Sequence, residues 1–132
     1  MMPGWRITVA VTAGGGLGSA ARWLVSLGTE AALGHGVPWG TLAVNVAGSF
    51  LIGLAAALTG PGARHAASPA VRAFLMAGFC GGFTTFSVFS LESLRMLEAQ
   101  GTGPFAAHVA LSVALWLSAA SAGYRIGSGG LR

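Results

Sequence analysis

The feature of this sequence that most limits its fold is a series of long apolar stretches without charge. Residues 40–58 and 73–91 contain no charged side chain, and in residues 105–124 only His108 can become charged near neutral pH. A helix needs about 20 apolar residues to cross the hydrocarbon core of a bilayer. Residues 5–27 form a less regular stretch that Arg22 interrupts. The pattern predicts an all-α integral membrane protein with four transmembrane helices, at about residues 5–27, 40–58, 73–97 and 105–124.

The composition indicates lipid as the natural solvent of the chain. Apolar residues make up 54% and charged residues 8%, whereas soluble domains contain roughly 25% charged residues. The segments between the apolar stretches are too short to fold alone, so residues 1–132 are expected to form a single transmembrane domain. We therefore expect that the protein is not an enzyme. The net charge of +4 comes from scattered arginines, which do not form the basic cluster that nucleic-acid binding requires.

The arginines are unevenly divided between the two sides of the predicted membrane domain. One side, with both termini and the second loop, carries five: Arg6, Arg64, Arg72, Arg125 and Arg132. The other side carries Arg22 and Arg95. Because cytoplasmic loops are enriched in basic residues, this division favours insertion with both termini inside.

Two pairs of glycines predict close contacts between helices. Gly14 and Gly18 form one GxxxG pair, and Gly78 and Gly82 form another. Small residues at this spacing let helix backbones approach closely, which matters in lipid because no hydrophobic drive brings the helices together.

A polar stripe follows one face of the second predicted helix. Thr41, Asn45 and Ser49 are spaced four residues apart on an otherwise apolar segment. A buried amide must find hydrogen-bond partners. Asn45 could bond to a neighbouring helix, or its N–H could donate to a permeating anion.

The third segment predicts a break in the helix. Gly81 and Gly82 are adjacent, and the β-branched Thr84 and Thr85 follow closely. Adjacent glycines weaken a helix by roughly 1 kcal/mol each. Non-helical backbone inside a membrane survives only where protein buries it or where it lines a cavity. Such a break exposes carbonyls that hold a hard cation such as Na⁺ and a helix N-terminus that favours an anion; the alternative is a simple packing kink.

Aromatic and hydroxyl side chains follow the break. Phe86 and Phe89 share a helix face, and an aromatic ring has a positive edge that can face an anion without its water shell. Core packing is the alternative role for this pair. His108 and Ser112 form a polar pair at i,i+4 on the fourth helix; an ionisable group within a membrane indicates function, but an interfacial position for His108 is equally compatible with the sequence.

Three motifs together resemble the CrcB/Fluc family of fluoride channels. They are Gly-Gly-x-x-Gly-x-x-x-Arg at 14–22, Gly-Thr-Leu-x-Val-Asn-x-x-Gly-Ser-Phe at 40–50 and Gly-Phe-Cys-Gly-Gly-Phe-Thr-Thr-Phe-Ser at 78–87, with Glu92 at the family's usual place. The third motif is highly specific, and the likeness covers essentially the whole chain. The resemblance implies a passive fluoride-selective channel in the cell (inner or plasma) membrane, built as an antiparallel, dual-topology homodimer with the third helix broken mid-membrane.

The resemblance also implies roles for individual residues. It places the ion path along Asn45, Thr85, Phe86, Ser87, Phe89 and Ser112. It implies a structural Na⁺ at the dimer centre, held by the backbone carbonyls of Gly81 and Thr84 from both subunits. Arg22 would lie near an aqueous vestibule and Glu92 near a pore mouth.

The chain departs from the family pattern at three positions. Val88 stands where Thr is usual, His108 where Tyr is common and Trp116 where Ser often occurs. Dual insertion would also predict a near balance of arginines across the membrane, which the division of five against two does not provide.

Three other functions fit the sequence less well than the channel. A small multidrug transporter needs a carboxylate within the first helix, and residues 1–27 contain no Asp or Glu. A proton-coupled fluoride exchanger would have only Glu92 as its proton carrier. A non-transporting structural subunit would explain the glycines, but not the joint presence of Asn45, the helix break and the phenylalanine pair.

Overall fold

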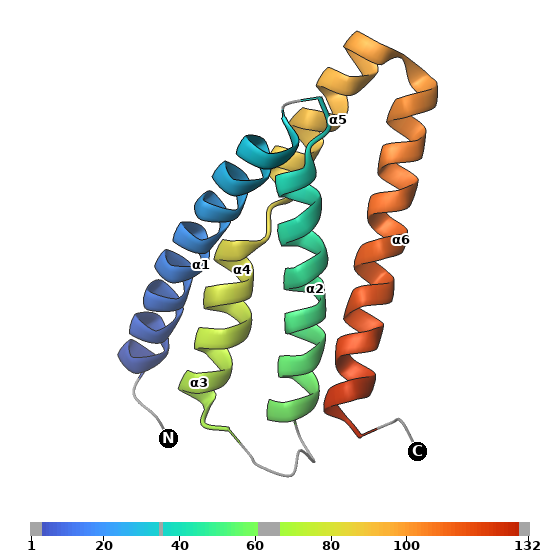
Figure 1. The fold of residues 1–132 in the computed structure, drawn as a ribbon. Helices are drawn as coiled ribbons and strands as arrows, with labels where there is room; N and C mark the ends of the chain where they lie inside the picture. The colour runs from blue at the N-terminus through green and yellow to red at the C-terminus, as the bar shows by residue number, and fades with distance from the viewer. Residues whose placement is uncertain (1–3, 35, 61–66, 130–132) are drawn as a thin grey trace.

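The computed structural model describes residues 4–34, 36–60 and 67–129, and all regular secondary structure in this part of the chain is helical, without a strand. Four rods lie side by side in Figure 1. The elements are α1 (Gly4–Leu33), α2 (Trp39–Thr59), α3 (Pro69–Ala73), η1 (Phe74–Cys80), α4 (Gly81–Phe83), α5 (Phe86–Gln100) and α6 (Thr102–Gly127). The elements from α3 to α5 together form the third rod, and α1 begins at the same end of the bundle at which α6 ends (Figure 1).

Three of the described helical segments are long and apolar enough to cross a membrane. They are Trp39–Thr59, Pro69–Gln100 and Thr102–Gly127, with hydropathies of 1.9, 1.5 and 1.6. The chain is therefore a multi-pass membrane protein. At 30 residues α1 has the required length, but its many glycines and Arg22 make it less apolar, so the fourth span stays a prediction.

The two predicted glycine pairs pack against each other. A Cβ added at Gly14 would lie 2.5 Å from the carbonyl oxygen of Phe74, and one added at Gly78 would lie 2.9 Å from that of Val11. Gly18 and Gly82 touch the facing backbone as closely. Real Cβ atoms do not approach backbone so closely, so only glycine lets α1 lie against η1 and α4. The prediction of close helix packing from the GxxxG spacing is confirmed.

A second glycine seam joins α2 to α6, and the sequence did not single it out. Gly53 of α2 lies against the carbonyl oxygen of Ala120, and Gly123 of α6 lies against that of Phe50. Gly127, which forms a GxxxG pair with Gly123, also lies against α2, at Leu54 and Ala57. Their close contact holds the C-terminal halves of α2 and α6 side by side (Figure 1).

The third rod changes its geometry twice. Ser68 caps its start, where its side chain accepts a hydrogen bond from the backbone N–H of Val71. Residues Phe74–Cys80 then form a π-helix. After the short α4, Thr84 and Thr85 are extended, with φ/ψ of −85°/162° and −151°/126°. The rod is therefore interrupted between α4 and α5.

The arginine-rich side predicted from the sequence corresponds to one end of the bundle. Arg6 lies in the first turn of α1, Arg72 in α3 and Arg125 in the last turn of α6. These helix ends lie at the end of the bundle where α1 begins and α6 ends in Figure 1. Arg64 and Arg132 lie outside the described residues.

Candidate functional site

The interruption of the third rod is held by Asn45 of α2. Its amide nitrogen Nδ2 donates to the carbonyl oxygen of Thr85 at 2.9 Å, and its oxygen Oδ1 accepts from the backbone N–H of Thr85 at 2.8 Å. Both residues are buried, with exposed fractions of 5% and 8%. The Asn45 side chain thus bonds to both the N–H and the C=O of Thr85, which in a continuous helix would bond to other backbone groups. One N–H of Nδ2 is used in this way, which leaves its second N–H for another acceptor.

The same contacts leave two backbone carbonyls without the N–H groups that would donate to them in a continuous helix. In a continuous helix the N–H of Thr85 would bond to Gly81, and that of Val88 would bond to Thr84. Here the N–H of Thr85 donates to Asn45, and the N–H of Val88 donates to the Thr85 hydroxyl at 3.3 Å. The carbonyls of Gly81 and Thr84 therefore lose their i+4 donors at the break.

Phe89 is the aromatic centre of the site. It is 5% exposed, and three rings surround it. The Phe86 ring centroid lies 5.8 Å away, that of His108 5.3 Å and that of Trp116 4.7 Å, the last in an edge-on arrangement. Phe89 thus links the break to α6.

Several buried polar atoms near Phe89 have no hydrogen-bond partner among the described residues. They are Ser93 Oγ, His108 Nε2, Ser112 Oγ and Trp116 Nε1. The last three belong to residues spaced four apart on α6, so they share one face of that helix. Ser112 is 1% exposed and Ser93 4%. Buried polar atoms in folded proteins nearly always have a partner, so this row is suited to bind water, a ligand or polar groups of another chain.

The residues that flank the break are open to the outside of the chain. Phe86 is 72% exposed, and Gly81 and Ser87 are also exposed. A groove of about 270 Å³ runs along the break. It is lined by Asn45, Gly48, Ser49, Ile52, Met76, Cys80, Gly81, Thr84, Thr85, Phe86 and Trp116.

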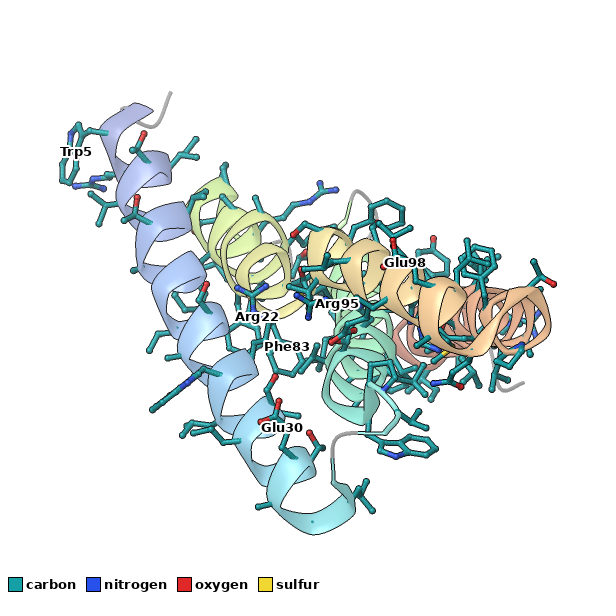
Figure 2. The ribbon with its side chains drawn as sticks, turned by 90° about the horizontal axis from the view of Figure 1, so that it is seen from above. Trp5, Arg22, Glu30, Phe83, Arg95 and Glu98 are labelled. Carbon is teal, nitrogen blue, oxygen red and sulfur yellow. The ribbon has the colours of Figure 1, made fainter. Side chains whose placement is uncertain are left out.

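Two further cavities meet at Ser26 and Thr41, which line both. The smaller, of about 230 Å³, includes Arg22 and reaches Thr85 and Val88. The larger, of about 410 Å³, includes Glu30, Glu92 and Arg95. Figure 2 shows Arg22 and Glu30 of α1 directed toward the other helices, whereas Trp5 points away from them. These cavities form a charged approach from the end of the bundle to the break.

Glu92 lines the larger cavity and is held there by a hydrogen bond. The hydroxyl of Thr41 donates to Glu92 Oε1 at 2.9 Å, and Oε2 is buried without a partner among the described residues. Since Thr41 precedes Asn45 by one helical turn, α2 contacts both the break and the carboxylate. Glu92 therefore lies at the meeting point of α2, α5 and the larger cavity.

The structure brings some of the predicted site residues together and separates others. Asn45 and Thr85 are hydrogen-bonded to each other, and the Thr85 and Ser87 hydroxyls lie 3.3 Å apart. Phe86 and Phe89 are neighbours, but only Phe89 is buried. Ser112 belongs to the row of unpartnered atoms.

Sequence reasoning missed Ser93 and the bond between Thr41 and Glu92. The available signal for Ser93 was its position four residues after Phe89, which places both on one helix face. Thr41 was noted in the polar stripe, but pairing across 51 residues of sequence leaves no local pattern.

These features define the chain as a helical, multi-pass membrane protein with a polar, aromatic-lined site at a broken helix. Residues 9–124 match the family described as "CrcB-like protein, Camphor Resistance (CrcB)". The chain belongs to this CrcB family, and the resemblance stated from its motifs is confirmed.

Relatives with assigned names cover nearly the full chain. A protein of Nitrobacter hamburgensis named "Fluoride-specific ion channel FluC 1" is 47% identical over 122 residues, which is 92% of this chain and 95% of the relative. One of Rhodospirillum centenum named "Fluoride-specific ion channel FluC" is 48% identical over 119 residues, covering 89% and 92%. One of Nitrobacter winogradskyi with the same name is 46% identical over 122 residues, covering 92% and 95%. The names describe ion channels and not enzymes.

Proposed function

We propose that this chain is a fluoride-selective channel that lets fluoride leave the cell passively across the inner or plasma membrane. The observation that carries the proposal is the row of unpartnered buried polar atoms beside Phe89, in which Ser93, Ser112 and Trp116 carry a donor hydrogen and His108 adds an imidazole nitrogen. An anion that sheds its water needs such donors, because burying a bare charge is very costly. The fluoride-specific relatives support the choice of anion.

The ion path we propose begins at the charged approach and ends beside α6. Fluoride enters past Arg22, which attracts it, and past Glu92 at the mouth. It then meets the free N–H of Asn45 and the hydroxyls of Thr85 and Ser87. The aromatic edges of Phe86 and Phe89 and the hydroxyl of Ser112 complete the path.

A second copy of the chain completes the site in this proposal. Gly81 and Phe86 are exposed along the break. A carbonyl without its helical partner cannot face lipid without a large cost. An antiparallel, dual-topology homodimer of four-span subunits, with α1 as the first span, would set the two breaks against each other and cover both near mid-membrane. The same arrangement would give two pores related by symmetry.

The carbonyls at the break also fit a structural Na⁺. Hard cations take oxygen ligands, and unwound carbonyls within membrane helices hold Na⁺ in transport proteins. Gly81 and Thr84 are the residues whose i+4 donors are withdrawn, and two copies would supply four oxygens. The ion would cancel the repulsion of the facing carbonyls. We expect the dimer to melt at a higher temperature in Na⁺ than in choline.

Export follows from the membrane potential without any coupled energy source. Moving one charge through 100 mV is worth about 2.3 kcal/mol, which corresponds to a concentration ratio of about fiftyfold. An inside-negative potential therefore drives a permeant anion outward.

The test is fluoride efflux from liposomes that contain the purified protein, with chloride efflux as the control. We expect rapid fluoride loss that requires a compensating K⁺ current through valinomycin, and no loss of chloride. A pH change in the lumen that accompanies the fluoride would instead identify a proton-coupled exchanger that uses Glu92. No fluoride loss from well-folded protein would leave the structural subunit as the better description.

The aromatic pair gives a sharper test of the path. Replacing Phe86 and Phe89 together by Ile keeps apolar bulk but removes both positive ring edges. We expect fluoride flux to be lost from this variant. Leu91→Ile is the matched control, because Leu91 is an exposed aliphatic residue of the same helix, and its flux should equal that of the parent. Intact flux in the double variant would remove the phenylalanines from the path.

A further inference from the structure

His108 belongs to the row of unpartnered atoms, and its ability to take up a proton is not used by the proposed ion path. Its ring centroid lies 5.3 Å from that of Phe89. Its Nε2 is buried and has no partner among the described residues. It shares a face of α6 with Ser112 and Trp116, whose polar atoms are also unpartnered. An ionisable ring therefore lies within the row of donors beside Phe89.

The surroundings of His108 provide no fixed counter-charge from α2. The helices packed against α6 are α2 and α5, and α2 contains no titratable residue. The ionisable residues of α5 are Glu92, Arg95 and Glu98. Glu92 is directed to Thr41 of α2, and Arg95 and Glu98 are exposed.

Imidazole is the side chain whose charge ordinarily changes between about pH 5 and 8. Its protonated form donates from both ring nitrogens, and the face of a phenyl ring within about 6 Å attracts its charge. A buried imidazolium is nevertheless costly without a counter-ion. A small anion beside Nε2 would supply that counter-ion.

We propose that His108 takes up a proton together with the permeating fluoride, so that acid pH strengthens fluoride binding beside Phe89. The inference rests on the proposed channel function and adds a titratable binding residue to it. Proton binding and fluoride binding reinforce each other, because coupling between two sites is reciprocal. The neutral donors Ser112 and Trp116 cannot produce this dependence.

The test measures the fluoride concentration that gives half-maximal flux in liposomes, at about pH 8 and about pH 5. Protein-free liposomes at each pH correct for hydrogen fluoride that crosses lipid unaided. We expect the half-maximal concentration of the parent to fall about tenfold at acid pH, within the usual range of coupling between sites. His108→Gln should show no such fall.

Two further variants keep the test decisive. His108→Tyr retains a ring and a donor but cannot become cationic, so it should conduct without the pH dependence even if the Gln variant misfolds. The other two histidines, His35 and His65, lie outside the described residues, and replacing both by Gln should leave the tenfold fall intact.

A second readout does not depend on flux. Adding fluoride to the parent protein in unbuffered detergent solution should draw protons from the solution, and adding it to His108→Gln should not. A pH-independent parent, or equal pH dependence in parent and His108 variants, would overturn the inference while leaving the channel in place. No fluoride flux at any pH would instead overturn the channel function, and this inference with it.

Discussion

The double hydrogen bond between Asn45 and Thr85 leads to a direct prediction about stability. Asn45→Ala removes both partners of the Thr85 backbone, the acceptor for its N–H and the donor to its carbonyl. Because Asn45 and Thr85 are 5% and 8% exposed, water cannot readily replace the amide. The extended backbone at Thr85 is then left with two unsatisfied polar groups.

The size of the effect follows from the two bonds. Interhelical hydrogen bonds within membranes average about 0.6 kcal/mol and reach about 1.7 kcal/mol. Two such bonds give an expected loss of about 1–3 kcal/mol in the free energy of unfolding. Asn45→Asp should lose at least as much, because its carboxylate would face the Thr85 carbonyl and place a buried charge beside it.

Reversible unfolding in mixed micelles, with SDS as denaturant, measures this difference. Ser49→Ala is the matched control, since Ser49 lies one turn further along α2 and takes no part in the pair. Its stability should stay within about 0.5 kcal/mol of the parent. An Asn45→Ala protein as stable as the Ser49→Ala control would show that the amide does not hold the break in the folded protein.

Two other predictions concern a close contact of α1 at Gly18 and the indole N–H of Trp116. Gly18→Ala should lower stability by about 1–3 kcal/mol, because its Cβ would meet the backbone of Phe79. Gly16→Ala, a helical position with open space, should cost nothing and gain up to about 1 kcal/mol from helix propensity; equal effects in the same unfolding assay would contradict the close approach of α1. Trp116→Phe should leave stability within about 1 kcal/mol, because Nε1 has no partner in the described chain, but should reduce fluoride flux if that N–H faces the ion. Unchanged flux would place Trp116 outside the path.

The apolar stretches were enough to predict a helical membrane protein, because lipid demands long uncharged helices. The close packing of α1 against η1 and α4 at Gly14, Gly18, Gly78 and Gly82 was also predictable, because GxxxG spacing on a membrane helix indicates close backbone contact with another helix. The seam of α2 against α6 was predictable only in part. Gly123 and Gly127 have the GxxxG spacing on α6, but Gly53 on α2 becomes their neighbour only through the packing of the two helices.

The candidate site was predictable only as a set of residue types. The stripe of Thr41, Asn45 and Ser49 indicated polar contacts but left their partners open. The structure pairs Asn45 with Thr85 and Thr41 with Glu92, which depends on how α2 lies against the third rod. The ion path, the dimer and the Na⁺ site stay predictions, since each requires a ligand or a second chain.

The π-helix at Phe74–Cys80 determines where the third rod can lose one residue without disturbing the fold. A π-helical turn contains one residue more than an α-helical turn. A deletion of one residue here could be absorbed by closing ordinary α-helical bonds, with α3 and α4 kept in their orientations. The same deletion between Phe86 and Phe89, at the start of α5, would rotate the helix beyond it by about 100°, which would turn Phe89 away from α6. Natural length variation in the third rod should therefore concentrate between Phe74 and Cys80.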